Sequence, residues 1–415
     1  MAGIRRRIER TARRRRRPRV PRGRVLSALT TSTLALPGLA GGSELGDLGF
    51  TAEYRYSRYT EGDLPASKIQ AGNEQDRMEI EAHLIHLGGP LTNRIQLDLD
   101  VAHEVMSGAT PWYIEPDGTS GAPLQVMTGA TVDDQRTDGL LKSTLLFDRG
   151  TAALATGVSV ENDYLSVNGG LSGERFFNEK NTTLAGGIDF SYDFIEPTDP
   201  ELFNRTDEEE KQTALIFGGI SQVLSKNVAV QSTLQYQFAN GFLSDPYKRV
   251  YVDGAIVNDA RPDQRHQFSW LTRYRHHVEF LRATLHADYR LFLDDWGTNA
   301  HTIELAWYQT LWQSFRLIPS FRYYTQSQAD FYAPYFQGPR GDGYYTSDYR
   351  LSPFGAISWR IKAETRFQVW SFDWIANISY EQYTSGDDLA IKKVDVENPG
   401  LLNYDLLSVG FTTRF

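Results

Sequence analysis

The chain contains no cysteine among its 415 residues. This absence excludes disulfide scaffolds, thiolate catalysis and cysteine-bound metal. Beyond the N-terminal segment, no run approaches the roughly 18–20 consecutive apolar residues that a membrane-spanning helix requires. Aromatic residues, in contrast, are abundant: 22 Tyr, 22 Phe and 8 Trp are far more apolar surface than a disordered chain carries. These features leave a large aromatic-rich β protein, either water-soluble or in a membrane.

The first forty residues are predicted to be a secretory signal peptide. Twelve Arg and one Glu lie between Arg5 and Arg24, an apolar stretch from Val25 to Leu36 follows, and Pro37–Ala40 offers small residues to a signal peptidase. A basic nucleic-acid-binding arm is the alternative, but it leaves the apolar stretch unexplained. Without the leader, residues 41–415 hold 31 Lys and Arg against 51 Asp and Glu, so the formal charge changes from −9 to −20. The exported chain is therefore strongly acidic, which argues against nucleic acid as a partner.

The dominant pattern in residues 41–415 is alternation of apolar and polar residues over segments of about ten residues. From Arg94 to Val105, one face carries Ile95, Leu97, Leu99 and Val101, and the other carries Gln96, Asp98, Asp100 and Glu104. Segments of this length and period are typical of tilted transmembrane strands. A soluble β-sandwich also alternates, but its strands average 5–6 residues, about half the length found here.

About sixteen such segments are present, and the connections between them alternate between short and long, except that the connections at 162–164 and 293–300, expected on the long-loop side, are short. Backbone groups in hydrocarbon must all be paired, so spanning strands form a closed cylinder. We therefore expect residues 41–415 to form one closed antiparallel transmembrane β-barrel of about 16 strands, with short periplasmic turns and longer extracellular loops. The predicted strands are 49–59, 77–87, 94–105, 136–147, 151–161, 165–176, 182–194, 212–224, 227–239, 265–275, 280–292, 301–311, 314–326, 348–361, 365–382 and 402–415.

The last predicted strand ends on an aromatic residue. Phe415 is in phase with Leu407, Val409 and Phe411 on one face of that strand. This ending resembles the signal that the outer-membrane barrel assembly machinery reads. The resemblance implies that machinery and outer-membrane lipid as partners.

Several segments resemble a bacterial outer-membrane protein family catalogued as a domain of unknown function, number 3570. They are residues 29–40, 107–112, 241–248, 294–297 and 301–309. The resemblance spans most of the chain and implies an outer-membrane barrel, with a more general similarity to porins. It implies no established activity. Association of such genes with flavin-attachment and thioredoxin-like genes hints at a redox setting in the envelope.

The polar faces of the predicted strands differ in charge from one part of the chain to another. The "acidic wall" comprises Glu79, Glu81, Asp98, Asp100 and Glu104. The "basic wall" comprises Arg265, Arg273, Arg275, Arg282, Arg290, Arg316, Arg322, Arg350 and Arg360. In a ring of about sixteen strands the two walls face each other across the lumen, and opposed charges there would orient dipolar solutes. The alternative is that these residues pair with lumen neighbours and fill the barrel.

The long 106–135 connection is the candidate constriction loop, with Trp112, Asp133 and Asp134 as its candidate residues. An external flap is the alternative. Its acidic residues, and those of the run from Asp207 to Glu210, could bind divalent cations, although solvated surface charge is the simpler interpretation. We assign no metal or cofactor site.

No catalytic motif is found. His103-Glu104 begins a zincin pattern, but Ser107 stands where the second His is required. Phosphate-loop and dinucleotide fingerprints are absent from the sequence. We therefore expect a porin-like passive channel for small polar solutes rather than an enzyme. The alternative is a non-conducting barrel that acts as a scaffold for an envelope complex, with a redox or flavoprotein partner. Homo-oligomerisation is left open.

Overall fold

The computed structural model describes residues 49–415, apart from residue 74 and residues 129–131. The predicted signal peptide at residues 1–40 lies outside the described residues. In the described part of the chain, no helix is both long and apolar enough to cross a membrane.

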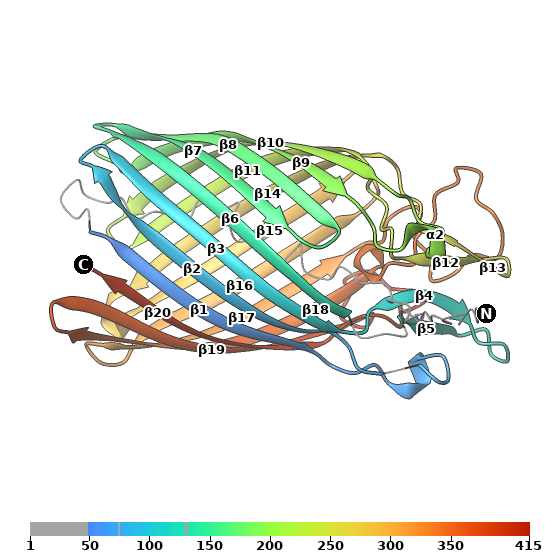
Figure 1. The fold of residues 1–415 in the computed structure, drawn as a ribbon. Helices are drawn as coiled ribbons and strands as arrows, with labels where there is room; N and C mark the ends of the chain where they lie inside the picture. The colour runs from blue at the N-terminus through green and yellow to red at the C-terminus, as the bar shows by residue number, and fades with distance from the viewer. Residues whose placement is uncertain (1–48, 74, 129–131) are drawn as a thin grey trace, which may run out of the picture.

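Sixteen antiparallel strands pair in order into a closed barrel, and β1 pairs with β20 to complete the ring (Figure 1). Each predicted strand has its counterpart, so the predicted fold class is confirmed. The strands are β1 (Thr51–Glu61), β2 (Glu79–Thr92), β3 (Ile95–Gly108), β6 (Val132–Phe147), β7 (Gly150–Val160), β8 (Tyr164–Phe177), β9 (Thr182–Ile195), β10 (Glu209–Ser225), β11 (Val228–Gly241), β14 (Gln264–Val278), β15 (Ala283–Asp294), β16 (Asn299–Thr310), β17 (Phe315–Gln326), β18 (Phe354–Val369), β19 (Phe372–Gly386) and β20 (Tyr404–Arg414).

The two ends of the barrel differ in their connections. One end, here the turn end, carries short connections and both ends of the described chain; the other, the loop end, carries most of the long connections (Figure 1). Two hairpins project from the loop end, β4 (Pro111–Pro116) with β5 (Pro123–Met127), and β12 (Arg249–Val252) with β13 (Ala255–Asn258). Short helical turns are η1 (Ala66–Lys68), α2 (Pro200–Phe203), η2 (Glu279–Leu281) and η3 (Tyr349–Leu351).

The outer face of the barrel carries rows of exposed apolar side chains. In one row, register pairs join Leu154 to Leu171, Leu171 to Ile188, Ile188 to Ile216 and Ile216 to Tyr236 across five successive strands. All five side chains are exposed, between 43% and 55%. Because side chains alternate along a strand, the residues between them point into the barrel. The outer-membrane type of barrel has this inverted polarity.

The turn between β18 and β19 lies further along the chain than the sequence predicts. Lys362, Ala363 and Glu364 were expected to form it, but β18 continues to Val369 and the turn falls at Trp370 and Ser371. The charged residues that suggested a turn instead lie inside the barrel, where Glu364 accepts from Lys362 at 2.8 Å and from Arg316 at 3.0 Å. A charged residue that points into the polar interior of the barrel does not interrupt its strand.

The seam of the barrel is completed by the C-terminal residue. Phe50 and Phe415 exchange backbone hydrogen bonds of 2.8 and 3.0 Å, and their rings stack at 5.8 Å between centroids. The Phe415 ring also meets Phe372 edge-on at 5.6 Å. Phe415 is thus in register with the closing pair of strands; its role as an assembly signal remains a prediction.

Candidate functional site

Three residues of the predicted acidic wall lie on the inner face of the barrel. Asp98, Asp100 and Glu104 alternate along β3 with outward Leu99 and Val101. His86 on β2 contacts both aspartates, at 2.8 Å from Asp100 and 3.9 Å from Asp98. Glu104, 3% exposed, lies closer to the loop end, opposite Arg136 of β6.

Glu79 and Glu81 correct the prediction, because the structure places them on the outer face. Ile80, which lies between them, is 3% exposed and packs inside the mouth with Tyr59 and Met106. Glu79 instead pairs with Arg58 at 3.2 Å in an exposed ion pair. The two glutamates were predicted to point inward because the apolar residues that alternate with them were expected to face lipid, as apolar residues of a barrel strand normally do. At this part of the mouth, Tyr59, Ile80 and Met106 form an apolar cluster inside the barrel.

Most residues of the predicted basic wall do lie on the inner face. They are Arg265, Arg273 and Arg275 on β14, Arg290 on β15, Arg316 and Arg322 on β17, and Arg360 on β18.

Carboxylates accompany several of these arginines. Arg265 donates to Asp294 at 2.5 Å, Arg275 pairs with Asp288, and Arg316 pairs with Glu364 at 3.0 Å. Arg360 lies 3.6 Å from Glu304 and 3.9 Å from Glu381. Local pairing therefore neutralises part of the positive charge.

Two arginines of the predicted basic wall are exceptions. Within the described part of the chain, neither the Arg290 nor the Arg322 guanidinium makes a hydrogen bond or a salt bridge. The charged neighbours of Arg290 include Arg322 and Arg273 as well as Glu304 and Asp288. Positive charge is therefore only partly compensated at this part of the inner face.

Arg282 and Arg350 were wrongly assigned to strands. Arg282 follows η2 at the turn end with a φ of +51° and is solvent-exposed, because the chain reverses there before β15 begins at Ala283. Arg350 lies in η3, within the long connection between β17 and β18. A cluster of buried ions holds it at the loop end.

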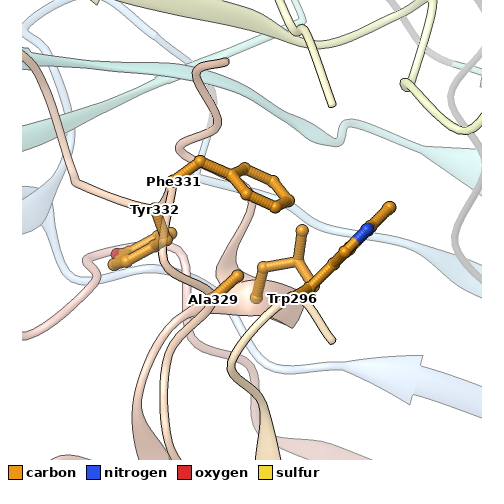
Figure 2. Close-up of a cluster of buried hydrophobic side chains, with 5 residues drawn as sticks. Trp296, Ala329, Phe331 and Tyr332 are labelled. Atoms are coloured by element: carbon orange, nitrogen blue, oxygen red, sulfur yellow. The ribbon is translucent and has the colours of Figure 1, made fainter. Parts of the chain in front are cut away.

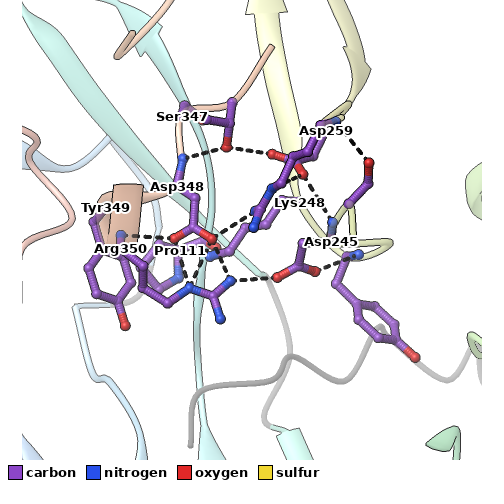
Figure 3. Close-up of polar contacts among 12 residues, drawn as sticks. Pro111, Asp245, Lys248, Asp259, Ser347, Asp348, Tyr349 and Arg350 are labelled. Atoms are coloured by element: carbon purple, nitrogen blue, oxygen red, sulfur yellow. Dashed lines mark hydrogen bonds and ion pairs between the residues drawn. The ribbon is translucent and has the colours of Figure 1, made fainter. Parts of the chain in front are cut away.

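That buried cluster joins two long connections, 242–263 and 327–353. Arg350 contacts Asp348 at 2.5 Å and Asp245 at 2.7 Å, and Arg261 donates to Asp348 at 2.9 Å and to Asp259 at 2.7 Å (Figure 3). Lys248 reaches a third connection by donating to the Pro111 carbonyl oxygen. The loops of this end are thus tied together by buried charge.

Burial and charge shift the pKa values of these groups. Burial by itself would raise the pKa of Asp348, but Arg350, Arg261 and Lys248 outweigh it and hold that pKa well below its ordinary value. Burial lowers the pKa of Lys248, with Asp348 and Asp245 opposing the shift. Asp348 is therefore ionised in the folded cluster and attracted to three cations.

Apolar packing supports the same region, which we call the loop cap: residues 242–263, 327–353 and 387–403. Trp296, Ala329, Phe331, Tyr332 and Leu351 form one buried cluster (Figure 2). A second cluster places Tyr349 and Leu401 against Phe354 and Ala356 of β18. Because Phe354 and Ala356 are inward-facing, the loop cap packs against the inner wall and narrows the mouth.

The candidate constriction loop occupies a different position. Trp112 lies on β4, in the hairpin that projects beyond the mouth, with its ring 5.2 Å from that of Tyr113 (Figure 1). Asp134 is buried near the start of β6. The side chain of Asp133 lies outside the described residues. Tyr349 and Leu401, which pack inside the mouth, belong to other connections, whereas Met106 of the candidate loop packs there beside Tyr59 and Ile80. A constricting role for this loop remains a prediction.

Sequence reasoning missed the loop cap because its contacts join segments about a hundred residues apart without periodicity. The only sequence signal was indirect: Asp245 and Lys248 lie in the 241–248 segment that resembled the barrel family.

Three solved structures that resemble this chain share little sequence identity with it. A "Bacterial polysaccharide outer membrane secretin" shares 11% identity with a TM-score of 0.44, over 88% of this chain and 97% of the other. OpdQ of Pseudomonas aeruginosa shares 8% identity with a TM-score of 0.40, over 89% and 97% of the two chains. The siderophore receptor PirA of Pseudomonas aeruginosa shares 10% with a TM-score of 0.41, over 82% of this chain and 56% of the receptor.

Comparison with curated protein sequences gives no match. The model of one family, described as "Protein of unknown function (DUF3570)", matches residues 26–403. The chain is thus an outer-membrane-type β-barrel that belongs to the DUF3570 family.

Proposed function

We propose that this protein resides in the bacterial outer membrane and acts as a passive channel for small polar solutes. The exposed apolar rows on the outer face support residence in a bilayer. A ring of sixteen strands is of a size that can enclose an aqueous channel. The predicted signal peptide would direct export. No step of this function requires a catalytic group.

The uneven charge of the inner face is the observation that carries the proposal. In the described residues of β14–β18, nine inward Lys and Arg side chains accompany four carboxylates, whereas in β3–β9 eight inward carboxylates accompany two such cations. In the ring, β3 stands eight strands from β15, and β6 eight strands from β16. On this proposal the acidic arc of β3–β9 lies across the lumen from much of the basic arc of β14–β18, and the two excesses would set up a transverse field there.

Planar-bilayer recordings of the purified full chain test this proposal. We expect stable conductance, and we expect the double substitution Arg290→Gln with Arg322→Gln to shift ion selectivity toward cations. Arg282→Gln is the control for each single substitution, since it removes one positive charge from an exposed turn. Conductance without a shift, or an equal shift in the control, would remove the opposed-wall explanation.

The packing of the loop cap favours a second candidate function, a non-conducting scaffold for an envelope complex. Buried ion pairs and apolar clusters fill part of the mouth. A redox or flavoprotein partner would then bind at the barrel surface. The absence of conductance from folded, inserted protein would support this scaffold and contradict the channel.

A further inference from the structure

Three arginines lie close together on the inner wall, and their guanidinium groups make no hydrogen bond to any residue that the structure describes. They are Arg290 on β15, Arg322 on β17 and Arg360 on β18. In the strand register, Arg322 lies directly opposite Ser358, and Arg360 is two residues further along the same strand. Long side chains in this diagonal relation can reach a common point. The Arg322 and Arg360 guanidiniums can therefore act on one group of a solute.

Two carboxylates lie beside these arginines but do not saturate them. Glu304, which is opposite Arg322 in the register, is 3.6 Å from Arg360, and Glu381 is 3.9 Å from Arg360. Both distances exceed that of a hydrogen bond. Arg290, whose charged neighbours include Arg322, adds a third cation. Three guanidiniums against two carboxylates leave an excess of positive charge at this part of the wall.

Buried donors at the same place also lack partners. The Nε of Arg360 and the hydroxyl of Ser320, which lies opposite it in the register, are both buried and have no hydrogen-bond partner among the described residues. A buried donor without an acceptor is costly. These residues line a recess of about 40 Å³, whose walls also include Glu304, Arg322, Ser358 and Glu381. It has room for one small group of a solute, since a water molecule takes about 30 Å³. An acceptor entering this recess would satisfy both donors.

We propose that this recess binds the carboxylate group of a small monovalent organic anion, held by Arg322 and Arg360 with the Ser320 hydroxyl as a further donor. The planar guanidinium presents paired N–H donors that match the two oxygens of a carboxylate. Because Glu304 and Glu381 line the same recess, a divalent anion is repelled more strongly than a monovalent one. The inference rests on the proposed channel and deepens it, since it names carboxylates as the solutes that the basic wall takes up.

Saturation-transfer NMR of the purified full-length protein in detergent, with acetate as the probe, tests the site without requiring conductance. We expect saturable transfer to the acetate methyl group, with a dissociation constant on the order of 1 mM, as suits a molecule of so few atoms. Sulfate at equal ionic strength should compete only weakly. Arg322→Lys keeps the charge but loses the paired donors, and it should weaken acetate binding roughly tenfold. Arg282→Lys, in the exposed turn, is the matched control and should bind acetate as the original chain does.

Heat-modifiable migration on gels establishes that each variant is folded. If Arg322→Lys does not fold, Arg360→Lys is scored in its place. The absence of saturable acetate binding by the folded original chain would overturn the site. So would unchanged binding by the folded variant, an equal loss in the Arg282→Lys control, or sulfate competing as strongly as acetate itself.

Planar-bilayer recordings separate the failure of this site from the failure of the proposed channel. Arg322→Lys should leave ion selectivity unchanged because the charge of the basic wall is preserved. Its conductance in potassium acetate should saturate at a roughly tenfold higher concentration than that of the original chain. Conductance that rises linearly with acetate in the original chain would overturn the site and leave the channel proposal standing. Acetate binding by a barrel that does not conduct would support the site and contradict the channel.

Discussion

The ion pair between Arg77 and Glu61 provides a direct test of how the mouth is held together. Both side chains are 0% exposed, and Arg77 Nε lies 2.6 Å from Glu61 Oε2. A second Arg77 bond, of 3.0 Å, reaches the Gly400 carbonyl oxygen in the connection between β19 and β20. Arg77→Met would keep most of the side-chain volume while leaving the Glu61 carboxylate buried, with the hydrogen bond from the Tyr59 hydroxyl at 3.0 Å but without its cation.

The expected cost of this substitution is large because the pair is fully buried. Removing one partner of a buried ion pair costs about 3–5 kcal/mol of unfolding free energy, since the other charge is left uncompensated. The matched control is Arg58→Met. Arg58 pairs with Glu79 at 3.2 Å, but these side chains are 51% and 48% exposed. An exposed pair of this kind contributes about 0–1 kcal/mol.

Urea unfolding in phospholipid vesicles, followed by tryptophan fluorescence, measures both variants. The Arg77 variant should unfold at a clearly lower urea concentration than the Arg58 variant, and the slope of the transition should be unchanged. Equal effects of the two substitutions would refute the reasoning, because they would mean that burial does not distinguish the pairs.

The loop cap is expected to become less stable in acid, because the pKa of Asp348 is lowered in the folded protein. The resulting contribution to stability is complete above the pKa of an unfolded Asp, about 4, and is lost as the pH falls below that value. The stability difference between the original chain and Asp348→Asn should therefore shrink below about pH 4, and a difference independent of pH would contradict this. Gly108 has a φ of +121°, and an added Cβ would lie 2.2 Å from the Arg77 carbonyl oxygen. Gly108→Ala should cost about 1–3 kcal/mol in urea titrations, whereas Gly118→Ala, with nothing within 4 Å of the added atom, should cost little. Phe415→Ala removes the stacked ring at the seam and should lower the yield of folded barrel in the outer-membrane fraction; an unchanged yield would contradict that role.

The strand count and most strand positions follow from the sequence, because alternation with period two reports directly which side of a strand meets hydrocarbon. The assignment of Leu99 outward and Asp98 and Asp100 inward shows how well this works in the middle of a strand. It fails for Glu79 and Glu81, where the strand enters the mouth and its apolar side packs inward against Tyr59. In the membrane-embedded part of the barrel, apolar side chains point outward. This rule fails at the mouth, where apolar side chains also pack inside the barrel.

The loop cap could not be predicted for a related reason. No local sequence pattern shows that Arg350 lies in a loop rather than in a strand. Its ion-pair partner Asp245 is 105 positions away in the sequence. Likewise, Asp134 of β6 comes close to Asp163 of the β7–β8 connection because β6 pairs with β7. Such contacts depend on strand register and loop packing, which local sequence patterns do not encode.

The central claim is that apolar side chains face lipid while charged side chains face a wet interior, and four single-cysteine variants along β9 test it. Because the chain has no cysteine of its own, only the introduced thiol reacts. With the protein reconstituted in liposomes, a water-soluble maleimide should label Asp189→Cys and Ser191→Cys. It should spare Ile188→Cys and Phe190→Cys, whose native side chains are 53% and 49% exposed on the outer face. Uniform labelling of all four positions, or labelling of Ile188→Cys and Phe190→Cys alone, would contradict the account.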